Sequence, residues 1–153
     1  WYRTQHYYDS GSWRATWAGE GGGVLINQSP HQLDLVQWVV GKLPSKVNGF
    51  CKYGYWHDIE VDDDVTTFVE YENGATGTFV TSSGDAPGTN RFEIVCDGGT
   101  LICEGDKLIL RKLEQFETVF TKENTAPFAC PRWVTSEVET DGMNLQHKGI
   151  YPS

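Results

Sequence analysis

The spacing of apolar residues changes near position 46, and the change separates a helical segment from a strand-rich remainder. A short apolar run at 24–26, directly after three glycines, predicts a brief strand. Ser29 and Pro30 then suit the N-cap and the first position of a helix, with Gln32 as the capping-box partner. Gly41 is typical of the end of this helix. Two apolar stripes along it predict that the helix is buried.

From residue 46 onward, alternating apolar positions and turn sequences predict consecutive antiparallel strands. Asn73-Gly74 and Asp97-Gly98-Gly99 are strong hairpin signals, and Gly105-Asp106 separates a further pair. The expected strands are 47–56, 65–71, 75–81, 92–96, 100–103 and 107–112, with an additional edge strand at 116–121. One helix followed by such strands predicts an α+β fold, with an open, mostly antiparallel sheet and one face covered by helix. We expect residues 1–121 to form this domain and residues 122–153 to be an irregular, truncated C-terminal tail.

The composition is that of a globular domain, and the net charge limits which binding partners are expected. Hydrophobic residues make up 39% of the chain, and the formal net charge is -9. Such acidity argues against nucleic acid or an anionic membrane as a partner, because phosphates are bound by Lys and Arg. No run approaches the roughly 18 apolar residues of a membrane span. The four cysteines form no Cys-x-x-Cys pair. Two disulfides are compatible with their number, but free thiols are favoured, which indicates a reducing, cytoplasmic location.

An acidic run at 57–64, His-Asp-Ile-Glu-Val-Asp-Asp-Asp, is a candidate for cation binding. Alternate side chains in it suit a divalent cation, but the central Gly and terminal Glu of a calcium loop are missing. A charge run between strands is more often a solvated turn. We therefore expect no metal site.

His31 is the strongest candidate for chemistry. Asn27 ends the expected strand, and His31 follows in the first turn of the helix, so the two side chains can converge on one spot. Asp34 shares the helix face of His31. The positive end of the helix dipole favours a neutral imidazole, which suits a general base. Spacing alone, however, favours a structural histidine that only caps or packs.

Two segments precede this helix. Residues 1–20 combine six aromatic rings with Arg3 and Arg14, and they predict an ordered loop or extended arm. The rings either pack over the domain edge or form a pocket wall for a hydroxyl-rich ligand. The glycines at 21–23 precede the expected strand, whereas a dinucleotide fingerprint follows one. We interpret them as backbone that passes close to a bulky group.

The string Gly-Gly-Gly-Val-Leu-Ile-Asn at 21–27, with His31 and Asp34 after it, resembles the C-terminal domain of the glucose–fructose oxidoreductase/inositol dehydrogenase (Gfo/Idh/MocA) family. Tyr7-Tyr8 and Trp13-Arg14 before it fit the same pattern, which covers about two-thirds of the chain. The resemblance implies an N-terminal Rossmann domain, absent here, that binds most of an NAD or NADP cofactor. It also implies a C-terminal domain that binds substrate and builds homo-oligomers through its sheet.

Carried over by motif, His31 falls on the family's catalytic histidine. Asn27 stands where inositol dehydrogenase-like members have Asp. An amide can form hydrogen bonds, but it cannot carry the negative charge of an Asp carboxylate beside His31. The residues expected to bind substrate are Asn27, Arg3, Trp13, Arg14 and Asp34.

The resemblance implies an NAD(P)-dependent dehydrogenase of a sugar, inositol or related polyol, with His31 as general base during hydride transfer. The chain contains no Glu-Lys-Pro motif and no nucleotide fingerprint, so we expect these residues alone to be inactive. Two alternatives stay open: a non-catalytic sugar-binding or assembly module, and a relative that uses NAD to cleave glycosides.

Overall fold

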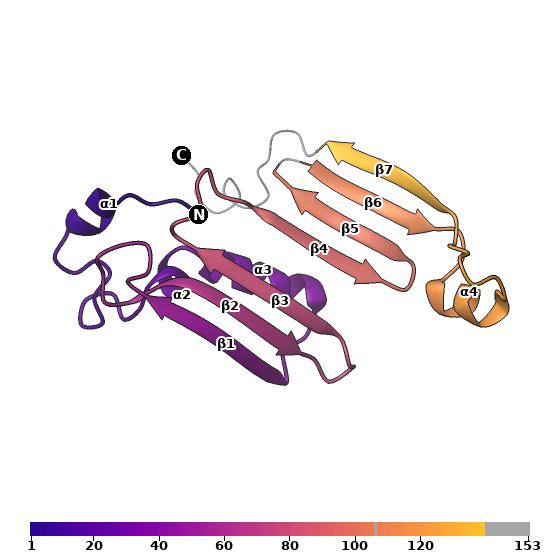
Figure 1. Ribbon diagram of the computed structural model, residues 1–153, viewed down its shortest axis with the longest axis horizontal. Coiled ribbons are helices and arrows are strands. Elements are labelled where there is room, and N and C mark those ends of the chain that lie inside the picture. The colour runs from indigo at the N-terminus through magenta and orange to yellow at the C-terminus, as the bar shows by residue number, and fades with distance from the viewer. Residues whose placement is uncertain (106, 140–153) are drawn as a thin grey trace. The chain divides into compact units, whose positions relative to one another are not determined.

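The computed structural model describes residues 1–105 and 107–139, and the chain divides into two compact units, 1–89 and 90–153 (Figure 1). Each unit is built around its own antiparallel sheet. The predicted α+β class with open antiparallel sheets is confirmed, but the strands form two sheets and not one. After the third strand the chain pairs with the N-terminus, where Tyr2 bridges Gly84. Among the described residues, no helix is long and apolar enough to cross a membrane.

The first unit has a three-stranded sheet in the order β1-β2-β3, with β2 in the centre. The helix α2 packs against β2 and β3 and so covers part of one face. The elements are α1 (Gln5–Asp9), α2 (Val24–Asn27), α3 (Pro30–Val40), β1 (Lys46–Tyr53), β2 (Asp62–Glu70) and β3 (Thr76–Ser82).

The second unit has a four-stranded sheet in the order β4-β5-β6-β7, in which all neighbours are antiparallel (Figure 1). Its elements are β4 (Arg91–Cys96), β5 (Gly99–Glu104), β6 (Lys107–Leu113), α4 (Glu117–Glu123) and β7 (Trp133–Glu139).

Both predicted hairpins form. Gly74 has φ +82°, the left-handed conformation that an Asn-Gly turn needs, and it connects β2 to β3. Cys96 pairs with Gly99 across the second turn and sets the register of β4 against β5. The predicted ends of α3 are also correct: the helix starts at Pro30, and Gly41 follows it with φ +71°.

The prediction of a strand at 24–26 is wrong, because these residues belong to α2. The carboxylate of Asp62 accepts hydrogen bonds from the backbone N–H groups of Gly23 and Leu25, and these bonds satisfy donors of the first helical turn. The capping box is wrong as well. Ser29 makes no side-chain capping bond; its hydroxyl donates to the carbonyl of Val24 at 2.6 Å.

The prediction that α3 is buried is wrong too. None of its residues is buried, and Trp38 is 79% exposed. Trp38, Val39 and Val40 are therefore open to solvent among the residues that the structure describes.

Two predictions fail in the second unit. Residues 116–121 contribute to helix α4, since Asp97 caps it: the carboxylate accepts both the backbone N–H and the hydroxyl of Thr118. Residues 133–139, expected in an irregular tail, form β7 because β6 offers a free edge for pairing. The rest of that expected tail, 140–153, lies outside the described residues.

Candidate functional site

The acidic run at 57–64, which spans the end of the loop at 54–61 and the start of β2, organises the end of the first sheet. The expectation of a solvated turn is wrong, since Asp62 is buried and Asp63 is fully buried. The carboxylate of Asp63 accepts hydrogen bonds from the backbone N–H groups of Tyr55, Trp56 and His57 at 2.7–3.0 Å. A buried carboxylate must be paired or hydrogen-bonded, and here backbone donors meet that need. In the described part of the chain, no three His, Cys, Asp or Glu side chains gather around a common point suited to a metal ion.

His57 lies buried beside Asp63 and joins the loop to the N-terminus. Its Nε2 is 2.9 Å from the carbonyl oxygen of Arg3, and a carbonyl can only accept, so Nε2 carries a proton. Its Nδ1 is 3.4 Å from both the Asp63 carboxylate and the Ser83 hydroxyl. The ring of Tyr8 packs on the imidazole with centroids 4.8 Å apart. Burial raises the pKa of the Tyr8 phenol, and a hydrogen bond with Ser83 partly opposes that rise.

The segment 1–20, the N-terminal arm, is ordered and packs over the end of the sheet where β1 finishes and β2 begins (Figure 1). Tyr8, Ala15 and Val61 form a buried cluster there. The amide side chain of Gln5 pairs with the backbone of Asp58, donating to its carbonyl and accepting from its N–H. The arm is thus docked on the 54–61 loop.

Three of the predicted substrate-binding residues come together around Tyr7. The guanidinium of Arg14 lies 4.6 Å from the Tyr7 ring centroid and 4.5 Å from that of Trp13, and it donates to the Tyr7 hydroxyl. The guanidinium of Arg3 lies 5.3 Å from the same Tyr7 ring. Half of the Trp13 side chain remains exposed. The group presents cationic and aromatic surface, which suits a ligand rich in hydroxyls or carrying negative charge.

Asn27 and His31 stand on either side of the turn between α2 and α3. The Asn27 amide donates to the carboxylate of Glu20, which also accepts the backbone N–H of Ala15 at 2.7 Å. His31 and Asp34 are exposed, and neither side chain forms a hydrogen bond or ion pair with any other described residue. No hydrogen bond within this part of the chain joins Asn27 to His31.

Several residues of this region were not identified from the sequence. Glu20 stands directly before the glycines, and Tyr7 belongs to the Tyr7-Tyr8 pair of the family pattern. Their positions in the motif could therefore have indicated both residues. His57 and Asp63 lie in the acidic run at 57–64. A run of charged residues in a sequence does not show which of its carboxylates is buried after folding. All four cysteines are free, in agreement with the expectation of thiols.

Of the three glycines, which the sequence suggested pass close to a bulky group, Gly23 lies against the backbone of β2, whereas Gly21 has open space around it. A Cβ on Gly23 would overlap the carbonyl of Asp62, so only glycine fits this position. The backbone N–H groups at the start of α2 are occupied by the Asp62 carboxylate. They are therefore not available to a nucleotide phosphate.

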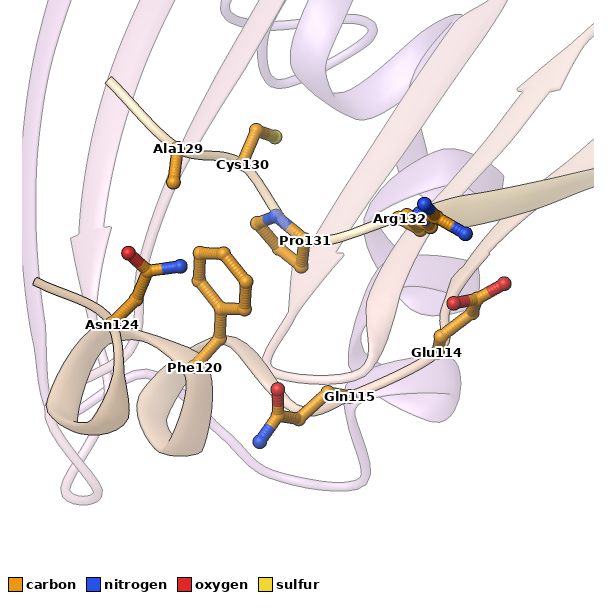
Figure 2. A pocket seen from close by; sticks show the side chains of 8 residues that line it. All are labelled: Glu114, Gln115, Phe120, Asn124, Ala129, Cys130, Pro131 and Arg132. Carbon is orange, nitrogen blue, oxygen red and sulfur yellow. The ribbon is translucent and has the colours of Figure 1, made fainter. Parts of the chain in front are cut away.

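A separate hollow of about 390 Å³ lies in the second unit, and Figure 2 shows Phe120 of α4 pointing toward Pro131 within it. Its lining residues are Glu114, Gln115, Phe120, Asn124, Ala129, Cys130, Pro131 and Arg132. None of the predicted site residues lines this hollow.

Two open antiparallel sheets and a few short helices make this an α+β fold. Residues 1–102 match the sequence model of the GFO/IDH/MocA C-terminal domain. The chain therefore belongs to the Gfo/Idh/MocA family, as a C-terminal domain of this oxidoreductase family.

Solved structures of similar fold include dehydrogenases. The WlbA dehydrogenase from Chromobacterium violaceum, in complex with NADH and UDP-GlcNAcA, is 27% identical with a TM-score of 0.55, over 72% of this chain and 29% of that chain. The WlbA dehydrogenase from Bordetella pertussis, with the same ligands, is 26% identical with a TM-score of 0.55, over 72% of this chain and 32% of that one.

Levoglucosan dehydrogenase, in complex with NADH and levoglucosan, has a TM-score of 0.59 at 22% identity, over 82% of this chain and 34% of that chain. This likeness shows the fold alone. The chain spans about a third of the length of these solved relatives. No curated protein matches the chain.

Proposed function

We propose that the chain is the substrate-binding domain of an NAD(P)-dependent dehydrogenase that acts on a sugar, inositol or related polyol. Membership of the family supports an oxidoreductase. The WlbA structures, which contain NADH and a UDP-linked sugar, support a nicotinamide cofactor and a sugar-like substrate for this chain. The observation that carries the proposal is the exposed His31 in the first turn of α3, inside the family match.

The cofactor would be bound mainly by an N-terminal domain, because the one glycine-rich turn described here has its donors occupied by Asp62. When bound there, the nicotinamide would supply the hydride acceptor. His31 would remove the proton from the substrate hydroxyl. Its ring is exposed and has no competing partner among the described residues, so it can turn toward a substrate.

Substrate hydroxyls would meet the residues around Tyr7 and the Asn27–Glu20 pair. Trp13 offers an aromatic ring with the Arg14 guanidinium beside it, and Arg3 offers a second guanidinium beside Tyr7. Asn27 keeps its carbonyl oxygen as an acceptor while its amide nitrogen donates to Glu20. Asp34, exposed on the helix of His31, is a further acceptor.

The same enzyme would form homo-oligomers through its first sheet. Phe50 and Val80 flank Thr66 in one cross-strand row, and Phe68 stands in the next row of the same face. All three apolar side chains are exposed. Exposed apolar side chains in two neighbouring rows favour burial, and a second copy would cover them.

The deciding experiment measures dehydrogenase activity of the full-length enzyme on a panel of sugars and polyols with both cofactors. His31→Ala should lower turnover about 10²–10⁴-fold with little change in substrate affinity. His6→Ala, which removes an exposed histidine of α1, is the matched control and should keep normal turnover. A His31→Ala enzyme with normal turnover and a lower melting temperature would make the histidine structural.

The Asn27–Glu20 hydrogen bond favours a second candidate, a non-catalytic sugar-binding or assembly module. A carboxylate at position 27 would support proton transfer through His31, whereas the amide already has a partner. An enzyme that binds sugar from the panel but oxidises none of it with either cofactor would support this candidate.

A further inference from the structure

Four aromatic side chains at the end of β1 remain open to solvent. We name this group, Trp17, Tyr53, Tyr55 and Trp56, the aromatic platform. Each side chain is between 52% and 56% exposed. Single exposed rings are common on protein surfaces, but four exposed rings gathered at one strand end are typical of a binding surface.

The rings are arranged in two touching pairs. The centroids of Trp17 and Tyr53 are 6.0 Å apart with planes at 50°, and those of Tyr55 and Trp56 are 4.8 Å apart with planes at 73°. The ammonium of Lys52 lies 3.8 Å from the Tyr55 ring centroid. The first pair joins residues that are 36 positions apart in the sequence, so the tertiary structure brings Trp17 to the segment that carries the other three rings.

Carboxylates hold the platform in place. The buried Asp63 accepts the backbone N–H groups of Tyr55 and Trp56, and Glu60 accepts that of Trp17 at 2.7 Å. The indole N–H of Trp56 donates to Asp64 at 3.1 Å. The Trp56 indole also lies so close to Gly84 that a Cβ there would overlap it. The rings are therefore pre-organised before any ligand arrives, which lowers the entropic cost of binding.

We propose that the aromatic platform is a carbohydrate-binding subsite that takes a pyranose ring. The C–H faces of a pyranose are apolar and flat enough to stack on an indole or phenol ring. Its equatorial hydroxyls need hydrogen-bonding groups at the rim, and Lys52, Glu60 and Asp64 supply one ammonium and two carboxylates there. The carboxylates disfavour phosphate-bearing ligands, as does the net charge of -9.

This subsite goes beyond the proposed dehydrogenase. Its residues differ from those around His31 and Tyr7, and binding there needs neither a cofactor nor a proton acceptor. In an oligosaccharide or glycoside, the platform would hold a sugar unit that does not react.

The test is a calorimetric and ligand-observed NMR titration of the 153-residue chain with methyl β-D-glucopyranoside, cellobiose, cellotriose and uridine. We expect binding of the sugars at about millimolar Kd, with the Kd falling as the glucan lengthens. Trp17→Ala and Trp56→Ala should each weaken binding about tenfold or more, as expected for the loss of one stacking ring. Tyr53→Phe keeps the ring and should retain the affinity.

Trp38→Ala removes an exposed tryptophan from α3, outside the platform, and is the matched control. His31→Ala separates this subsite from the proposed function: it should leave platform binding unchanged even if dehydrogenase activity is lost or was never present. Absence of sugar binding, sugar binding that survives both Trp17→Ala and Trp56→Ala in folded protein, or a preference for uridine over the sugars would each overturn the proposal.

Discussion

The carboxylate of Asp62 accepts hydrogen bonds from the backbone N–H groups of Gly23 at 2.8 Å and Leu25 at 3.1 Å. Asp62 opens the central strand β2, and Gly23 precedes α2. The contact connects the sheet to the segment that carries Asn27 and His31. The position of the candidate site therefore depends on this buried carboxylate.

Asp62→Ala should lower the free energy of unfolding by about 2–4 kcal/mol, because one buried and one partly buried N–H donor lose their acceptor. Asp62→Asn retains one acceptor oxygen and should cost less. Urea denaturation followed by fluorescence measures both effects. Asp58→Ala, at an exposed side chain of the same run, is the control and should change the midpoint little. Equal midpoints for Asp62→Ala and Asp58→Ala would contradict the role of Asp62.

Gly23→Ala should be more damaging than Gly21→Ala. A Cβ at position 23 would overlap the Asp62 carbonyl, and the sheet backbone cannot move away easily. We expect a loss of about 3 kcal/mol or more, or failure to fold. Gly21 has φ +81° with open space around its Cβ, so Gly21→Ala should cost about 1–2 kcal/mol of backbone strain. Thermal unfolding of the two variants compares them, and the reverse order would refute this account of the glycines.

Tyr8 should make the protein less stable at alkaline pH. Burial raises the pKa of its phenol, so the folded state keeps the proton after the unfolded state, with a phenol pKa of about 10, has released it. The stabilising contribution is complete below about pH 10 and is lost as the pH rises through the raised folded pKa. Tyr8→Phe should therefore show a smaller drop in urea midpoint between about pH 9 and 11. Tyr2→Phe, at an exposed tyrosine, should behave like the unmodified chain.

Self-association through the first sheet is directly measurable. Phe50→Lys and Val80→Lys place charge on the exposed face formed by β1 and β3, where it would be buried in an oligomer. Sedimentation at tens of micromolar should show an oligomer for the unmodified chain and smaller species for these variants. Phe128→Lys, at an exposed phenylalanine of the second unit, should leave the oligomer intact. A purely monomeric unmodified chain would rule out the interface.

Asn27→Asp should destabilise the fold in a pH-dependent way. The amide now donates to Glu20, and the substitution would place two carboxylates against each other. Such a pair retains a proton in the folded state, so the stability deficit should be small in acid and grow as the pH rises toward neutrality. Unfolding curves at several pH values measure this trend. Glu20→Gln should remove the deficit when combined with Asn27→Asp, and a deficit independent of pH would argue against the contact.

Local sequence determined the elements whose causes lie within a few residues. The Asn73-Gly74 turn requires a positive φ that glycine supplies, so the β2–β3 hairpin followed from the sequence. Pro30 and Gly41 likewise marked the ends of α3. The glycine string with His31 and Asp34 was specific enough to indicate the family, which the match over residues 1–102 then showed.

The tertiary structure decided the elements whose causes lie far along the chain. A short apolar run fits a strand or a helical turn equally well, and residues 24–26 became helix because Asp62, 37 residues beyond Leu25, caps them. Asp97 converted residues 116–121 to helix in the same manner, and the free edge of β6 drew 133–139 into a strand. The burial of Asp63 and the docking of the N-terminal arm through His57 also depend on such distant partners. A local pattern does not contain the backbone donors and strand edges that these residues meet only after folding.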